Sequence, residues 1–166
     1  DCSHTSKRSS LEIMQLSRRP VVFSHTNVKA VFDHPRTVDD EQILACAATG
    51  GVIGLTGLGI FLGDPGASVM AFVRQIDYLA ERVGTAHIGL GLDTELCPGV
   101  NDLPAGENEE AWWPKAFYGG VSAQTQLQPE KLPEIAQVLE RLGYQDSDIN
   151  AIFGDNFMRV AEATWQ

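Results

Sequence analysis

The segment Pro20–Thr26 (PVVFSHT) decides the fold class, because it joins an unbroken apolar run to a histidine. Consecutive apolar residues without polar alternation are typical of a strand that is buried on both faces of a parallel sheet. We therefore predict a buried strand over Val21–Phe23 and place His25 at its carboxyl end. Because functional groups of parallel α/β barrels gather at that end of the strands, His25 is a candidate functional residue.

Three other short runs of apolar or small residues also end in a polar residue. Stretches with helical periodicity separate these runs, and an alternating strand–helix order predicts right-handed crossovers and a parallel sheet. The predicted strands are Asp1–Ser3 before His4, Val21–Phe23 before His25, Val52–Leu55 before Thr56 and His87–Leu92 before Asp93, and the predicted helices cover residues 6–18, 37–49, 69–83, 129–142 and 146–160.

The length of the chain limits how much of a barrel it can form. A closed eight-stranded α/β barrel usually needs ~250 residues, whereas this chain has 166. The four predicted βα units make about half of a TIM-type (β/α)8 barrel, followed by C-terminal helices. Because no repeat or linker divides the sequence, we expect residues 1–166 to form a single domain.

The composition argues against several classes of partner. A net charge of −10 would repel the phosphates of nucleic acids and of anionic membranes. The apolar stretches are too short to span a bilayer, and no signal peptide opens the sequence. Cys2, Cys46 and Cys97 form no CxxC pair, so we expect reduced cysteines and a cytoplasmic protein.

The two histidines at neighbouring predicted strand ends, His4 and His25, are candidate metal ligands. Adjacent parallel strands are ~4.8 Å apart, so both imidazoles could reach one ion, and imidazole suits zinc. Asp93 could then serve as a ligand or a proton acceptor. The alternative is structural: a histidine at a strand end is often only hydrogen-bonded, and Asp93 could cap the loop that follows it.

Arg36 lies in the loop after the His25 strand. It is either a surface charge paired with Asp39 or Asp40, or a clamp for a substrate carboxylate. His34 in the same loop is expected to be solvated, and His87 begins its strand at the end that carries stability.

Two further motifs are less specific. The stretch Gly57–Gly59 lacks the full dinucleotide fingerprint and is better explained by a tight turn. Trp112 and Trp113 lie in the region 94–128, which has no strong periodicity, and they could wall a pocket or pack at a subunit interface.

Several motifs together resemble the membrane (renal) dipeptidase family, zinc-dependent relatives of the amidohydrolases. The resemblance covers essentially the whole chain, and its motifs occur in the family's order. They are Asp1-Cys2-Ser3-His4, Phe23-Ser24-His25-Thr26, the His25 to Arg36 interval, Gly89-Leu90-Gly91-Leu92-Asp93 and Phe153-Gly154-Asp155-Asn156-Phe157-Met158-Arg159-Val160.

The resemblance implies an α/β barrel with two zinc ions bridged by a glutamate and a hydroxide, of which this chain matches the C-terminal half. His4 and His25 match the histidines that bind the second zinc. Asp93 matches the acid that takes a proton from the nucleophilic water and passes it to the leaving amine, and Arg36 matches the arginine that holds the substrate carboxylate. The implied reaction is attack of a metal-bound hydroxide on a dipeptide, with tolerance of a D-residue at the C-terminal side.

Two departures from the family pattern affect these expectations. No His-x-Asp pair for the first zinc occurs in the sequence, and the bridging glutamate is not found either. Asp93-Thr94-Glu95-Leu96 stands where the family usually has Asp-Phe-Asp-Gly. We therefore expect a zinc-dependent dipeptidase that is incomplete as an isolated chain, forming a homo-oligomer or complemented by an N-terminal half. The alternative is a non-catalytic barrel fragment or subunit that acts through assembly.

Overall fold

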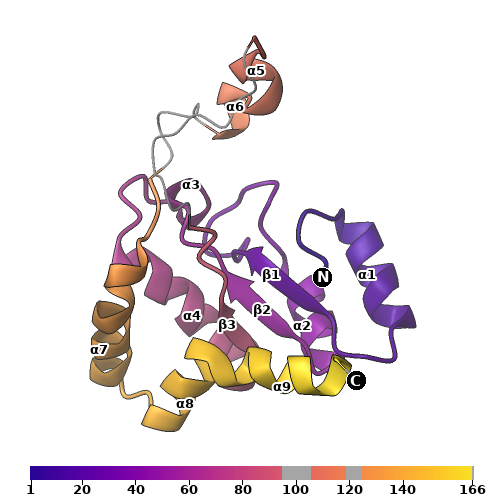
Figure 1. The fold of residues 1–166 in the computed structure, drawn as a ribbon, viewed down its shortest axis with the longest axis vertical. Helices are drawn as coiled ribbons and strands as arrows, with labels where there is room; N and C mark the ends of the chain where they lie inside the picture. The colour runs from indigo at the N-terminus through magenta and orange to yellow at the C-terminus, as the bar shows by residue number, and fades with distance from the viewer. Residues whose placement is uncertain (95–105, 119–124, 166) are drawn as a thin grey trace.

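A parallel sheet of three strands forms the centre of the molecule, with the spatial order β1-β2-β3 (Figure 1). The strands are β1 (Val22–Thr26), β2 (Val52–Leu55) and β3 (Ile88–Leu90). The structure is a computed structural model, and it describes residues 1–94, 106–118 and 125–165. The predicted α/β class and the parallel arrangement are confirmed.

The central strand β2 aligns the other two. All of its residues are buried, and Ile53 pairs with Phe23 on one side and with Ile88 on the other. The register between β1 and β2 shifts between Phe23 and Thr26. An irregularity of this kind bends a strand and redirects its side chains, and here it includes His25.

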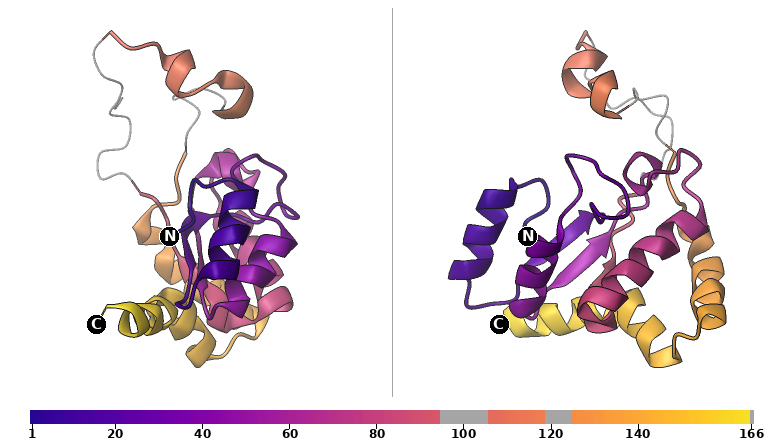
Figure 2. Two further views of the ribbon diagram at one scale, coloured as in Figure 1. Left: turned by 90° about the vertical axis from the view of Figure 1, so that its right-hand side faces the viewer. Right: turned by 180° about the vertical axis from the view of Figure 1, so that it is seen from behind.

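Two helices on the crossover connections cover one face of the sheet, α2 (Asp40–Ala48) and α4 (Val69–Val83) (Figure 2). Ser68 caps α4, and Gly84, with φ 80°, ends it as predicted. The helix α1 (Lys7–Leu16) packs beside α2. The largest fully buried side chains between these layers are Phe23, Ile43, Ile53, Leu55, Phe72, Ile76, Leu79 and Ile88.

The helix α9 (Asn156–Thr164) crosses the amino ends of the strands (Figure 1). The ring of Phe157 fits against Gly54 and Gly89, and a Cβ at Gly89 would lie 2.3 Å from Phe157 Cε2. Asn156 Nδ2 donates to a backbone carbonyl of β3 at 2.8 Å. The two strand glycines therefore allow the C-terminal helix to close this end of the sheet.

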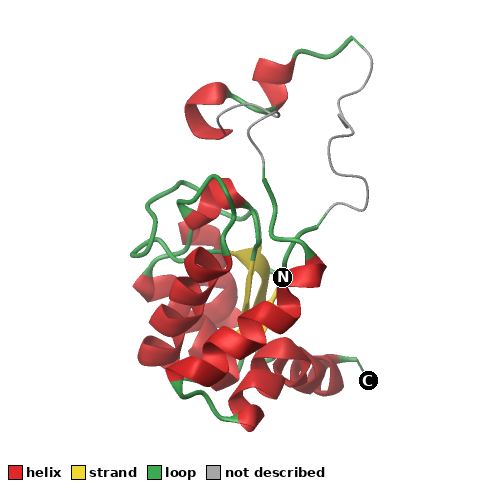
Figure 3. Ribbon diagram, turned by 90° about the vertical axis from the view of Figure 1, so that its left-hand side faces the viewer, coloured by secondary structure: helices red, strands yellow, loops and turns green. Residues whose placement is uncertain are grey.

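The remaining elements of the described part of the chain are α3 (Gly59–Leu62), the 3-10 turn Thr85–His87, α5 (Glu109–Trp112), α6 (Lys115–Tyr118), the 3-10 turn Pro129–Lys131, α7 (Leu132–Leu142), α8 (Asp146–Asn150) and the π-turn Ala151–Asp155. The pair α5 and α6 lies beyond the carboxyl ends of the strands (Figures 1 and 3). Within the described ranges, no helix has the length and apolar character needed to cross a bilayer.

Four strands were predicted, and the first of them along the chain, Asp1–Ser3, does not form. Cys2 N–H donates to Val22 O at 2.8 Å, which places this segment beside β1. The backbone of His4 has φ 62°, however, so the chain leaves the extended conformation directly after that bond. The last strand also ends earlier than predicted.

The C-terminal helical segment differs from the prediction in two ways. Its last helix, α9, ends at Thr164 and not at residue 160. The predicted continuous helix over residues 146–160 is interrupted by the π-turn, in which Gly154 has non-helical dihedral angles. A glycine inside a helical pattern weakens the helix, and it is the signal for this interruption.

Candidate active site

The two histidines predicted as ligands converge at the carboxyl end of β1. His4 Nε2 and His25 Nε2 are 2.7 Å apart, and their ring centroids are separated by 4.8 Å. Two bare lone pairs at this distance would repel each other, so a proton or a cation between the two nitrogens is favoured.

A tight turn positions His4. The backbone of His4 is left-handed, and Thr5 closes the turn with hydrogen bonds from its N–H and its hydroxyl to Cys2 O, at 3.2 and 2.8 Å. Cys2 is 1% exposed and anchors the turn in the core. Ser6 then caps α1, so the His4 imidazole is held between the sheet and the start of a helix.

Three polar side chains position His25. Ser24 Oγ lies 2.9 Å from His25 Nδ1, and Asp1 Oδ2 accepts from Ser24 Oγ at 2.5 Å. The His25 N–H donates to Ser3 Oγ at 3.1 Å. The imidazole is therefore fixed on the side opposite to the nitrogen that faces His4.

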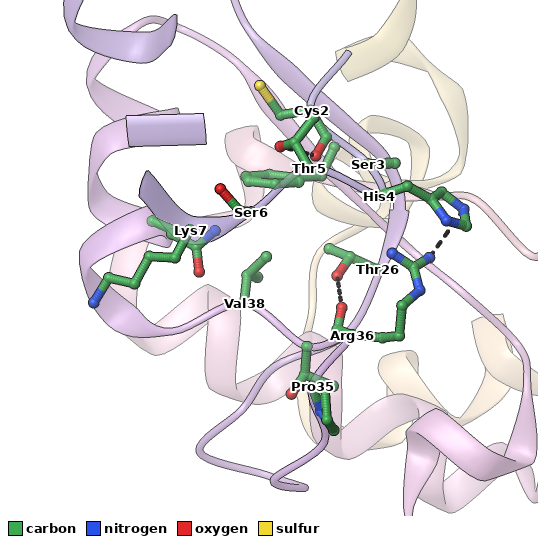
Figure 4. A pocket seen from close by; sticks show the side chains of 13 residues that line it. Cys2, Ser3, His4, Thr5, Ser6, Lys7, Thr26, Pro35, Arg36 and Val38 are labelled. Carbon is green, nitrogen blue, oxygen red and sulfur yellow. Dashed lines mark hydrogen bonds between the residues drawn. The ribbon is translucent and has the colours of Figure 1, made fainter. Parts of the chain in front are cut away.

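Arg36 is directed towards the histidine pair, not towards Asp39 or Asp40 (Figure 4). Its Nη2 donates to His4 Nε2 at 3.0 Å, and its guanidinium carbon lies 5.7 Å from the centre of the Phe61 ring. The two carboxylates instead pair with Lys7 and Arg82. Burial lowers the pKa of Arg36, and the negative charge of Asp93 acts in the opposite direction.

Asp93 acts on the same group of side chains. It follows β3, is exposed, and has a left-handed backbone with φ 58°. The pKa of His4 is lowered by burial and by the positive charges of Arg36 and His25, while Asp93 raises it. The negative charge of Asp93 therefore opposes the effect of burial on the pKa of both His4 and Arg36.

A polar cavity of about 260 Å³ adjoins the His4 side chain (Figure 4). It lies between the start of α1 and the loop after β1. Thr26 Oγ1 donates to Arg36 O at 3.1 Å and fixes the loop that carries the guanidinium. The cavity thus places Arg36 at the edge of a hydrophilic space large enough for a small polar molecule.

The prediction that His34 is solvated is wrong, because His34 is only 8% exposed. Its Nδ1 accepts from Arg36 N–H at 3.1 Å, so Nε2 carries the proton and donates to Phe117 O at 2.8 Å. The ring also packs against Phe61 and Tyr118. His34 therefore connects the Arg36 loop to α6.

The other sequence candidates lie outside this group or contribute to its walls. His87 Nδ1 donates to Gly51 O at 2.8 Å, a structural contact at the amino end of the sheet. Trp113 packs edge-on against Tyr118, at 5.2 Å between ring centroids. Gly57 lies between β2 and α3, and Gly59 begins α3; their N–H groups donate to Leu92 O and Thr125 O, so these residues bond distant backbone segments and do not form the predicted tight turn.

The donor set fits part of a zinc site. Two imidazole Nε2 atoms converge, and neutral imidazole is a preferred zinc ligand. A tetrahedral zinc with bonds of ~2.0–2.1 Å would separate the nitrogens by about 3.3 Å, so a small ring rotation from 2.7 Å accommodates it. Within the described residues, no cluster of three or more His, Cys, Asp or Glu side chains could hold a metal.

The sequence predicted roles for His4, His25, Arg36 and Asp93 but gave none to Asp1, Ser3 or Ser24. A usable signal was present, since both histidines directly follow a serine and Asp1 precedes the first of them. The contribution of Phe61 could not be found in this way, because α3 meets Arg36 only through the tertiary fold.

The family model described as membrane dipeptidase (peptidase family M19) matches residues 1–109. The chain belongs to this family. The match includes His4, His25, Arg36 and Asp93, and it confirms the resemblance seen in the sequence.

Known proteins similar to this chain include two curated relatives. An uncharacterized protein encoded in the pqqA 5′ region of Klebsiella pneumoniae is 26% identical over 171 residues, which cover 100% of this chain and 55% of that protein. Dipeptidase verJ of Clonostachys rogersoniana is 26% identical over 163 residues, which cover 98% of this chain and 36% of the dipeptidase. The membrane dipeptidase-family chain thus spans about half or less of their length.

A solved structure shows the same fold. The metallopeptidase of Rhodobacter sphaeroides, liganded with a phosphinate mimic of the dipeptide L-Ala-D-Ala, superposes with a TM-score of 0.70 at 22% identity. The similarity covers 99% of this chain and 42% of that one. At this identity the likeness establishes the fold of this membrane dipeptidase-family member and not its substrate.

Proposed function

We propose that this chain is the C-terminal half of a TIM-type barrel that hydrolyses dipeptides with zinc. The observation that carries the proposal is the convergence of His4 Nε2 and His25 Nε2 at 2.7 Å, with Arg36 bonded to the pair. Membership of the membrane dipeptidase family and the dipeptide mimic bound by the Rhodobacter metallopeptidase support the substrate class.

His4 and His25 would hold the metal through their Nε2 atoms. When bound, zinc lowers the pKa of a coordinated water to ~7 and polarises a carbonyl oxygen. Catalytic zinc normally has three protein ligands, so the two imidazoles need at least one more. We propose that the remaining ligands come from a complementing N-terminal half, because the chain spans only 55% and 36% of its relatives.

Arg36 would bind the substrate carboxylate. In the structure its Nη2 donates to the single lone pair of His4 Nε2. The same lone pair cannot accept this hydrogen bond and bind a metal at the same time. Loading the site therefore frees one donor of Arg36 without moving the loop. A guanidinium presents paired donors that match a carboxylate, and the adjoining polar cavity leaves space for a dipeptide terminus.

Asp93 would move the proton. Its negative charge acts to raise the pKa of both His4 and Arg36, and this influence supports the assignment. We assign it the acceptance of a proton from the nucleophilic water and its delivery to the leaving amine, which is general acid–base catalysis. Exposure of the side chain allows it to reorient between these two partners.

The alternative is a non-catalytic subunit that acts through assembly. It is favoured by one observation, the absence of a third metal-binding side chain beside the histidine pair among the described residues. Metal content of the purified chain distinguishes the two functions, since a non-catalytic subunit has no need to retain zinc.

The test is dipeptide turnover by the chain in zinc or cobalt, alone and with an N-terminal half of a relative. We expect His25→Ala and Asp93→Asn each to lower kcat/KM by at least about 100-fold, the scale of a lost general base or ligand. His87→Ala is the matched control, because the His87 side chain bonds Gly51 O at the other end of the sheet. Residual turnover that is unchanged in both site variants would refute the assignment.

A further inference from the structure

Asp1 forms a defined set of hydrogen bonds beside the histidine pair. Its Oδ1 accepts from the backbone N–H groups of Ser3 and Ser24, at 2.9 and 3.1 Å. Its Oδ2 accepts from the Ser24 hydroxyl at 2.5 Å. An ionised carboxylate can only accept, so each of the three partners must donate.

Counting protons fixes the direction of the next bond. The Ser24 hydroxyl has a single proton and gives it to Asp1, so Ser24 Oγ must accept from His25 Nδ1 at 2.9 Å. Ser3 Oγ, at 3.1 Å from Ser24 Oγ, can donate as well, because it uses only a lone pair for the His25 N–H. Every donor then has an acceptor, and His25 carries its proton on Nδ1.

This tautomer leaves the His25 Nε2 lone pair directed at His4. The Nε2 of His4 also presents a lone pair, because it accepts from Arg36. Two lone pairs at 2.7 Å are unfavourable until a cation lies between them. The hydrogen bonds of both histidines therefore favour the binding of a cation.

We propose that Asp1 and Ser24 are positioning residues that hold His25 in the Nδ1–H tautomer, so that Nε2 is available to a metal. The proposal rests on the proposed function only in taking zinc as the ligand. Metal-binding histidines usually donate their second ring N–H to an oxygen acceptor, and loss of that acceptor costs about 10–100-fold in metal affinity. Here the acceptor is the Ser24 hydroxyl, which the Asp1 carboxylate holds in one orientation.

The substitution Asp1→Asn tests the direction of the chain of hydrogen bonds. The amide oxygen must take the place of Oδ1, because two backbone N–H groups point at it. The amide NH₂ then faces Ser24 Oγ and donates to it, so the Ser24 hydroxyl turns to donate to His25 Nδ1. The substitution keeps the volume and both backbone bonds but moves the His25 proton to Nε2.

Two readouts on the full chain decide the proposal. Zinc affinity is measured by competition with a chromophoric chelator, and ¹⁵N NMR of the histidine rings reports which nitrogen is protonated. We expect Asp1→Asn and Ser24→Ala to weaken zinc binding about 10–100-fold and to lose the His25 Nδ1–H signal. Asp33→Asn is the control, because Asp33 is exposed and pairs only with Lys29.

The wild-type spectrum is decisive even where a variant does not fold. In the zinc-loaded chain, a His25 ring protonated on Nε2 would overturn the proposal, as would zinc affinity unchanged in both variants. The proposed function can fail separately: absent dipeptide turnover with an intact Nδ1–H signal and tight zinc binding would refute the enzyme and leave the positioning role standing.

Discussion

Left-handed backbone conformations occur at three described residues other than glycine, and two of them are His4 and Asp93. Such a conformation costs of order 1–3 kcal/mol for a residue with a side chain, although His and Asp tolerate it better than most. The cost is offset because backbone hydrogen bonds hold the residues just before these turns, from Cys2 N–H to Val22 O and from Gly57 N–H to Leu92 O. For His4 the turn brings the imidazole to 2.7 Å from His25 Nε2.

For single residues, the sequence predicted the position best where a residue follows a predicted strand. The positions of His4, His25, Arg36 and Asp93 follow from the topology of parallel strands, but their roles came only from the family resemblance. The exposure of His34 was predicted wrongly, because its position in a loop gave no sign of the two hydrogen bonds and the ring contact that bury it.

Replacement of Arg36 by lysine tests substrate binding. Lysine keeps the charge but cannot form the paired donor contact with a carboxylate. Loss of a hydrogen bond to a charged group is worth about 1.5–3 kcal/mol, so we expect KM for dipeptides to rise about 10–100-fold with a smaller change in kcat. Steady-state kinetics of Arg36→Lys and of the exposed control Arg8→Lys measure this, and an unaltered KM in Arg36→Lys would remove Arg36 from the binding role.

Among the secondary-structure elements, those with strong local signals were predicted well. The helix α4 has an apolar face, a serine cap and a terminal glycine, and it forms over the predicted residues. The strand β2 was also placed correctly, because its apolar run is bounded by Gly51 and Thr56. The π-turn before α9 depends instead on packing, since Phe157 must reach Gly54 and Gly89.

The cap of α2 allows a prediction about stability. Asp39 accepts from Gln42 N–H at 3.2 Å and pairs with Lys7 of α1 at 2.6 Å. We expect Asp39→Ala to lower the free energy of unfolding by about 1 kcal/mol, the usual effect of losing a side-chain cap. Asp39→Asn keeps a capping oxygen and should recover most of this loss at neutral pH.

The pH dependence follows from the pKa of Asp39. Burial acts to raise this pKa, but hydrogen bonds from Lys7 and Gln42 outweigh it, and the net shift is downward. A depressed pKa stabilises the fold above the unfolded value of ~3.9, and this contribution is lost as the pH falls through the folded value. The difference between wild type and Asp39→Ala, from denaturant titrations at several pH values, should therefore shrink below pH ~4. A difference that grows on acidification would contradict the ion pair.

For the whole molecule, the dominant feature is a sheet of three strands among the described residues. Strands β1 and β3 are both edges of the three-stranded sheet, and unpaired edges promote association. The length of the sequence alone predicted a sheet with open edges. It could not show which surface beside those edges would be apolar and exposed. That depends on how α9 crosses the sheet, which is a tertiary property of Phe157 and the two strand glycines.

An apolar surface beside the β1 edge predicts self-association of the chain. A cavity of about 420 Å³ there is lined by Val22 and by α9, next to Met158 and Trp165, which are 59% and 86% exposed. The net charge of −10 opposes contact between copies, so association should strengthen as salt screens the repulsion. Sedimentation velocity at rising protein and salt concentrations measures this association.

We expect the double variant Met158→Glu with Trp165→Glu to abolish the association. Leu142→Glu, on the exposed end of α7, is the control and should leave the association intact. A wild-type chain that stays monomeric in high salt would show that this surface does not drive assembly.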